Sequence, residues 1–145
     1  MKLTLIIVFT SMIFSENYNE PSYKLLLSND DIEIREYSSY IIARTSIPKS
    51  SKDDNNMFRT LASYIFGSNE KNESIPMTAP VTTYDDDDSY NMIFYMLDAD
   101  SVTDMPGTNG QDIVFERFEM GKCAVVSFSW LTSDSRIKHY KNKLS

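Results

Sequence analysis

Residues 58–81 have the sequence FRTLASYIFGSNEKNESIPMTAPV, in which a helical pattern gives way to an extended one. Apolar residues recur there at positions i, i+3, i+4 and i+7, the spacing of one helix face: Phe58, Leu61, Ala62 and Ile65. Gly67 is the residue type that commonly ends a helix, so we predict a helix from Asp53 to Phe66. Two prolines, each without an N–H donor, follow within Ile75 to Val81. This segment is therefore expected to be an extended edge, or a strand with a bulge, and not a central strand.

Strand patterns precede the helix. Tyr23 to Leu27 is a short apolar run, closed by the turn-forming residues Ser28 to Asp31. Ile32 to Tyr37 alternates between apolar and polar residues, and Tyr40 to Ile47 is rich in β-branched residues. We predict a hairpin from these two runs, with its turn at Ser38-Ser39 and one buried face.

Strand patterns also follow the helix. Asn91 to Leu97 predicts one strand, and a second hairpin is expected from Ile113–Met120 and Lys122–Ser129, turning at Gly121. A second helix is predicted from Thr132 to Leu144. The chain is thus expected to be an α+β domain built mainly on antiparallel sheet. The order hairpin, helix, hairpin, then hairpin and helix, suggests an internal duplication of roughly 80 residues whose second copy stops after its helix.

Composition narrows the function classes. A length of 145 residues suits one domain, and 41% hydrophobic residues suffice for a core. The net charge of −7 argues against nucleic acid, since affinity for the phosphate backbone comes from clustered Lys and Arg. Cys123 is the only cysteine, so no intramolecular disulfide or cysteine-based zinc site is expected.

The N-terminus has the pattern of a secretory signal. Lys2 precedes an apolar run from Leu3 to Phe14, which is shorter than the roughly 20 residues of a membrane span. We predict a signal peptide at residues 1–15, a lead-in at 16–22 and the folded domain at 23–145. A secreted or periplasmic location follows from this prediction. An uncleaved anchor and a buried first strand remain the alternatives.

The helix and the segment after it resemble those of the SOUL heme-binding family. The matching residues are Tyr64 to Asn69, Ile75 to Val81, Ile34 to Tyr37 and Phe58 to Ala62. The resemblance covers about residues 22–145. It implies a distorted antiparallel β-barrel with two helices, made of two pseudo-symmetric ββαββ halves. It also implies binding of heme or a related tetrapyrrole in a hydrophobic cleft, with the first helix as one wall.

The family's second wall is a hairpin that follows the second helix. Nothing follows Ser145 here, so the second half lacks its last two strands. The chain is expected to be either a fragment or a shortened version with an open pocket. Open sheet edges can pair with another chain, so self-association is expected too.

The expected ligand wall consists of apolar side chains of the first helix and the segment after it: Phe58, Leu61, Ala62, Ile65 and Met77. A flat tetrapyrrole binds largely by apolar burial, worth about 25 cal/mol per Å². The alternative is that the same helix face packs on the sheet, and the two roles can share residues.

Strong iron ligation is not expected. His139, the only histidine, falls in a cationic stretch of the second helix, so we give it little weight as an axial ligand. Cys123, Met57 and Met77 are further candidate ligands, but side chains of these types more often fill core space. The acidic run Asp85–Asp88 lacks the calcium-loop spacing and is interpreted as solvated charge, so no metal site is predicted.

The reactive residue types of the sequence and their positions favour binding over catalysis. One His and one Cys on separate elements do not suggest a nucleophile with its base, and no Gly-rich phosphate loop is present. The expected function is therefore non-catalytic binding of heme or a related tetrapyrrole. The alternatives are a carrier of another flat apolar molecule and a protein-interaction module on the same scaffold without heme affinity. The sequon Asn72-Glu73-Ser74 matters only if the organism glycosylates secreted proteins.

Overall fold

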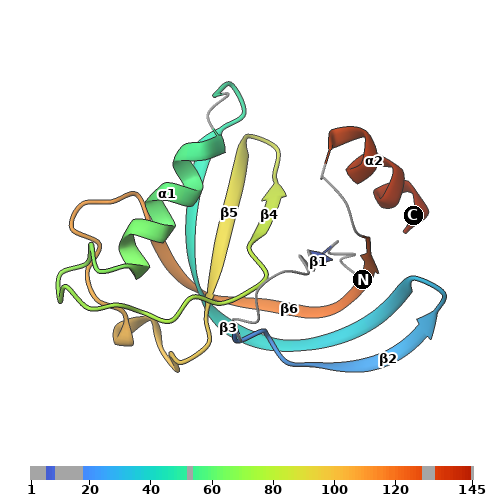
Figure 1. The fold of residues 1–145 in the computed structure, drawn as a ribbon, viewed down its shortest axis with the longest axis horizontal. Coiled ribbons are helices and arrows are strands. Elements are labelled where there is room, and N and C mark those ends of the chain that lie inside the picture. Colours follow the sequence, from blue (N-terminus) through green and yellow to red (C-terminus); the bar gives the residue numbers. More distant parts are fainter. Residues whose placement is uncertain (1–5, 9–17, 52–53, 129–132, 145) are drawn as a thin grey trace. The chain divides into compact units, whose positions relative to one another are not determined.

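The computed structural model describes residues 6–8, 18–51, 54–128 and 133–144 (Figure 1). The chain divides into two compact units. Of the described residues, the first unit combines 6–8, 22–39, 119–128 and 133–144, and the second combines 18–21, 40–51 and 54–118. The two longest strands, β3 (Ile32–Pro48) and β6 (Val114–Ser127), each contribute residues to both units.

The second unit is a sheet covered by one helix. The other elements of this unit are α1 (Asp54–Ile65), β4 (Thr82–Asp85), β5 (Ser89–Met96) and a short 3-10 helix (Val102–Asp104). β3 and β4 both pair antiparallel with β5. The register pairs Ile41 with Met96 and, at the other end of the ladder, Pro48 with Ser89.

Side chains of β3 and β5 alternate between two faces, as the period of two requires. Ile41 and Ala43 of β3 belong to one hydrophobic cluster with Phe94 of β5 and with α1. Arg44, which follows Ala43, therefore points to the face away from α1. The sheet face beneath α1 is consequently apolar, and the opposite face carries a polar group.

The first unit contains the other paired strands and the C-terminal helix: β1 (Ile6–Val8), β2 (Tyr23–Asn29) and α2 (Asp134–Lys143). β2 and β3 form an antiparallel hairpin, and β1 runs parallel to β6. On α2, the Tyr140 ring stacks on Phe128 with the ring centroids 4.2 Å apart. The Lys143 ammonium donates to the Asp31 carboxylate at 2.7 Å, which ties the end of α2 to the β2–β3 turn.

Both helices and one strand confirm the sequence prediction. α1 and α2 lie within the predicted ranges, with only their terminal residues differing. β5 matches the strand predicted at Asn91–Leu97 within two residues, and the acidic run does join β4 to β5. Among the described residues, neither helix has the length and apolar content needed to cross a membrane.

Both predicted hairpin turns are wrong. β3 continues without interruption through Ser38-Ser39. The first hairpin turns at Asp30-Asp31, within the predicted turn Ser28 to Asp31, and Asp30 has a φ of 53°. The two serines fit an extended strand, whereas an aspartate tolerates the left-handed backbone that a tight turn needs. Gly121 does have a φ of 61°, but β6 runs on through it as a single strand. A glycine inside a strand can mark an irregularity without reversing the chain.

The barrel and the duplication are not confirmed. The strands follow the order β1-β6-β3-β5-β4, with β2 also paired to β3, and in the described residues this sheet is not closed. The succession β2-β3-α1-β4-β5 has the ββαββ order, but β6 is one strand where a second hairpin was predicted. The part of the prediction that is confirmed is an α+β fold with a mostly antiparallel sheet and two helices.

Most of the predicted signal peptide lies outside the described residues. Within residues 1–15 only Ile6–Val8 is described, and it forms β1. Thr132, the predicted start of the second helix, also lies outside them.

Candidate functional site

The predicted ligand wall of α1 has a fully buried layer. Leu61 is 0% exposed, and Ala62 and Ile65 are buried too. Leu61 and Ile65 pack on the sheet in one cluster with residues of β3 and β5. Burial of this layer accounts for the helix's position, since each fully buried aliphatic side chain contributes about 1.5–3 kcal/mol.

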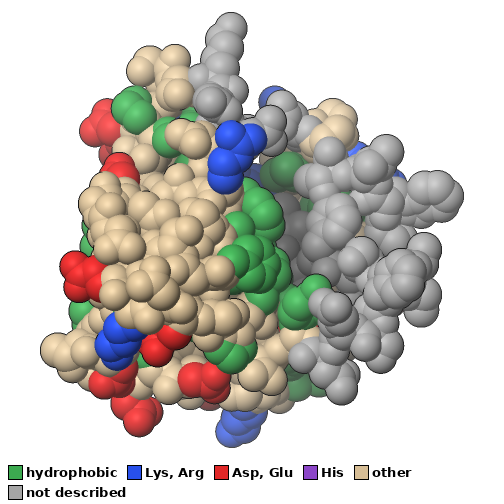
Figure 2. Space-filling view, turned by 60° about the vertical axis from the view of Figure 1, so that its left-hand side comes forward, with side chains coloured by type: hydrophobic (Ala, Val, Ile, Leu, Met, Phe, Trp, Pro, Cys, Tyr) green, Lys and Arg blue, Asp and Glu red, His purple; other side chains and the backbone are tan. Residues whose placement is uncertain are grey.

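The same helix also presents an exposed aromatic layer. Phe58 is 43% exposed and Phe66, directly after α1, is 65% exposed. Phe66 N donates to Ala62 O at 3.0 Å, so the helical path continues to Phe66. Eight residues along this path separate the two side chains by about 12 Å along the axis and about 80° around it. The Phe58 ring also makes an edge contact with Phe94 of β5, with centroids 5.7 Å apart. Exposed hydrophobic side chains are visible on the face shown in Figure 2.

The segment after α1, Ile75 to Val81, packs against the same hydrophobic cluster as Leu61 and Ile65. Ile75 N donates to Ile65 O at 2.8 Å, which returns the chain to the end of the helix. Thr78 Oγ1 donates to Tyr95 O at 2.7 Å and anchors the segment on β5. Between these anchors Met77 is half-buried and packs against the cluster. In the described residues the segment forms no strand: its one bridge pairs Thr78 with Asn19, and a bend follows at Ala79.

A small cavity lies beside this segment. Its volume is about 110 Å³, against roughly 300–1,000 Å³ for typical ligand pockets. Its lining comes from this segment, the end of β5 and the 3-10 region: Ile75, Pro76, Thr78, Met96, Leu97, Asp98, Ala99, Asp104 and Met105. None of the five predicted wall residues lines it. A tetrapyrrole does not fit this volume.

The residues considered as iron ligands are divided between the two compact units. Met57 is buried in the α1 cluster, and Met77 packs against it. Cys123 and His139 belong to the first unit. Cys123 is buried, which raises the pKa of its thiol, and His139 is exposed beside the Tyr140 ring. Among the described residues, no group of three or more His, Cys, Asp or Glu side chains could hold a metal ion.

Within the acidic run Asp85–Asp88, Asp86 makes hydrogen bonds to its own turn. The Asp86 carboxylate accepts hydrogen bonds from Asn91 Nδ2 at 3.0 Å and from Ser89 N at 2.8 Å. These bonds, with one from Asp88 N, hold the pKa of Asp86 below its usual value. Asp86 therefore organises the β4–β5 turn.

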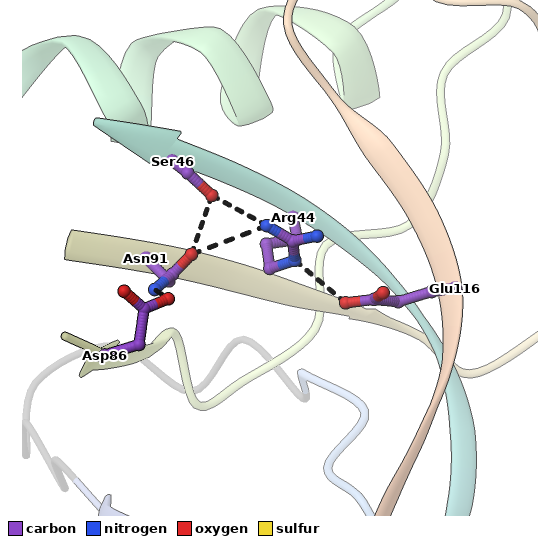
Figure 3. Close-up of polar contacts among 5 residues, drawn as sticks. All are labelled: Arg44, Ser46, Asp86, Asn91 and Glu116. Atoms are coloured by element: carbon purple, nitrogen blue, oxygen red, sulfur yellow. Dashed lines mark hydrogen bonds and ion pairs between the residues drawn. The ribbon is translucent and has the colours of Figure 1, made fainter. Parts of the chain in front are cut away.

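A polar network that the sequence analysis missed extends from this turn across the sheet (Figure 3). Arg44 Nε donates to Glu116 Oε1 at 2.8 Å, and Arg44 Nη1 donates to Ser46 Oγ at 2.8 Å. Ser46 Oγ in turn donates to Asn91 Oδ1 at 2.7 Å. The Glu116 carboxylate raises the pKa of the Arg44 guanidinium. The alternation of Arg44 and Ser46 within an apolar strand was the available signal.

Arg44→Met is expected to lower the free energy of unfolding by about 1.5–3 kcal/mol, the usual contribution of a hydrogen bond to a charged group. The methionine keeps most of the volume but removes the contacts with Glu116 and Ser46. Chemical denaturation of both proteins measures the change. Arg59→Met, at an exposed position of α1, is the control and should stay within about 0.5 kcal/mol of the parent. Equal stability of Arg44→Met and the parent would show that the network contributes nothing.

Comparison with known families shows a match to the SOUL heme-binding protein model over residues 18–145, nearly the whole chain. A comparison with curated proteins found no match. The family match contains both α1 and the segment after it. The chain therefore belongs to the SOUL heme-binding protein family.

Proposed function

We propose that this chain binds heme or a related tetrapyrrole, without catalysis, on the apolar surface of α1. The observation that carries the proposal is the exposed pair Phe58 and Phe66 on one helical path, in a chain whose family is described as heme-binding. Exposed aromatic rings suit a flat macrocycle, because each can stack on or pack against it. The family is one of binding proteins, which supports a binding role over an enzymatic one.

In this proposal the predicted wall acts as two layers. Phe58 and Phe66 contact the ligand directly, with Ala62 between them. Leu61 and Ile65 form the buried layer that fixes the helix on the sheet, and a ligand that opened the cluster would contact them as well. Met77 supports the same cluster from the segment after α1.

Contact is proposed to be mainly hydrophobic. The only histidine, His139, is an exposed residue of α2, and Met77 is half-buried. Apolar contact with a macrocycle does not depend on iron. A carrier of another flat apolar molecule is therefore the second candidate, favoured by the same exposed rings.

Because apolar contact does not depend on iron, hemin and iron-free protoporphyrin IX are expected to bind with dissociation constants within about threefold of each other. A threefold ratio corresponds to about 0.7 kcal/mol of binding free energy. Titrations followed by the Soret band and by quenching of Trp130 fluorescence measure both constants. His139→Ala should leave the hemin spectrum unchanged. A red-shifted, six-coordinate spectrum that is lost in His139→Ala would contradict hydrophobic contact and make His139 an axial ligand. No binding of either compound would refute the proposed function.

A further inference from the structure

The loop after α1 presents the one N-glycosylation sequon of the 145-residue sequence, Asn72-Glu73-Ser74. All three residues are exposed, and none is a proline. Because the attached sugar is bulky, a glycosylated chain can take its fold only where this asparagine reaches solvent and its neighbours are not packed. The loop meets this condition.

The buried side chain of Asn69 makes hydrogen bonds to the backbone of this loop. Asn69 Nδ2 donates to Glu73 O at 2.7 Å and to Tyr64 O at 3.0 Å. Asn69 Oδ1 accepts from Lys71 N and from Glu73 N, each at 3.2 Å. The backbone around the sequon is thus ordered by Asn69, without help from the Asn72 side chain.

Asn72 itself takes the left-handed conformation, with a φ of 51°, and its backbone N donates to Asn69 O at 3.0 Å. In the described part of the chain neither the Asn72 carboxamide nor the Ser74 hydroxyl makes a hydrogen bond. Nδ2 of Asn72 and Oγ of Ser74 are therefore both available to another molecule. A substituent on Nδ2 would displace no packed group.

We propose that Asn72 is a site of N-linked glycosylation when the chain enters a eukaryotic secretory compartment. The donor is an oligosaccharide linked to a lipid through a diphosphate, and a membrane oligosaccharyltransferase catalyses the transfer. Asn72 Nδ2 forms a bond to the anomeric carbon of the sugar, the bond from that carbon to the diphosphate oxygen breaks, and the lipid diphosphate leaves. One proton from Nδ2 passes to the enzyme's base. This inference does not depend on tetrapyrrole binding.

The test translates the full chain, preceded by a proven secretory leader, in the presence of microsomes from the endoplasmic reticulum. The protease-protected product is expected to gain one glycan, which endoglycosidase H removes. Asn72→Gln and Ser74→Ala should each abolish the shift, whereas Ser74→Thr should keep it. Asn109→Gln is the matched control, because Asn109 is also exposed with a φ of 53° but has no Ser or Thr two residues later.

Two outcomes would overturn the proposal. One is a translocated chain without an endoglycosidase-sensitive shift, and the other is a shift that persists in Asn72→Gln. Transfer can precede folding, so the glycosylated protein is also purified and melted. A cooperative transition within a few degrees of the unglycosylated protein is expected, since the structure places Asn72 away from packed groups. Loss of that transition would show that Asn72 is not free in the fold.

Discussion

Leu61→Gln is expected to lower the free energy of unfolding by about 4 kcal/mol, the largest effect of a single substitution proposed for this chain. Leu61 is fully buried in the cluster between α1 and the sheet. Losing the apolar burial of a leucine side chain costs about 1.5–3 kcal/mol. An amide without a partner at that place adds about 1–3 kcal/mol. Chemical denaturation measures the loss, and Leu61→Met, which conserves volume, should cost less than about 1.5 kcal/mol.

The same variant tests the buried layer of the proposed site. Hemin affinity is compared well below each melting temperature, so that both proteins are folded. We expect Leu61→Gln to weaken binding, because the helix that carries the exposed rings loses its support. Unchanged affinity in a folded Leu61→Gln protein would remove the buried layer from the site.

Asn69→Ala is expected to lower the free energy of unfolding by about 2–4 kcal/mol. The Asn69 side chain is fully buried and makes four hydrogen bonds to the backbone of the loop and of the end of α1. Alanine leaves the buried Tyr64 O without this partner, at about 1–3 kcal/mol, and removes three part-buried bonds in the loop, where water can replace part of what is lost.

Hydrogen exchange localises the effect of this substitution. The amides of Lys71 and Glu73, which donate to Asn69 Oδ1, should exchange much faster in Asn69→Ala than in the parent. Amides of β5 should change less. Asn109→Ala, at an exposed loop position, is the control and should leave stability within about 0.5 kcal/mol. A stable Asn69→Ala protein with protected loop amides would show that the carboxamide does not order the loop.

The sequence predicted the parts of the fold that follow from side-chain period. α1 was found because its apolar residues recur with the period of a helix and bury one face against the sheet. The hairpins were misplaced because Ser38, Ser39 and Gly121 are compatible with both a turn and a strand. Pairing with distant strands decides between these states, and a local pattern does not contain that information.

The candidate site was predicted only in part. The helix pattern identified Leu61, Ala62 and Ile65 as apolar but could not separate the buried side of α1 from the exposed rings. Phe66 was predicted as the last helical residue, and its exposure could not be read from its type. The network of Arg44 and Glu116 joins positions 72 residues apart in the sequence, and only the strand pairing brings them together.

The most direct test of the proposed site is the hemin affinity of the double variant Phe58→Gln/Phe66→Gln. Glutamine keeps the helix but removes both rings, and a loss of about 1 kcal/mol for each ring would weaken binding about 30-fold. Leu27→Gln is the matched control, because Leu27 is 61% exposed on β2 in the first unit. Both variants are first shown to unfold cooperatively. We expect the double variant to bind hemin about 30-fold more weakly, with Leu27→Gln within twofold of the parent. Parental affinity in a folded double variant would contradict a ligand site on α1.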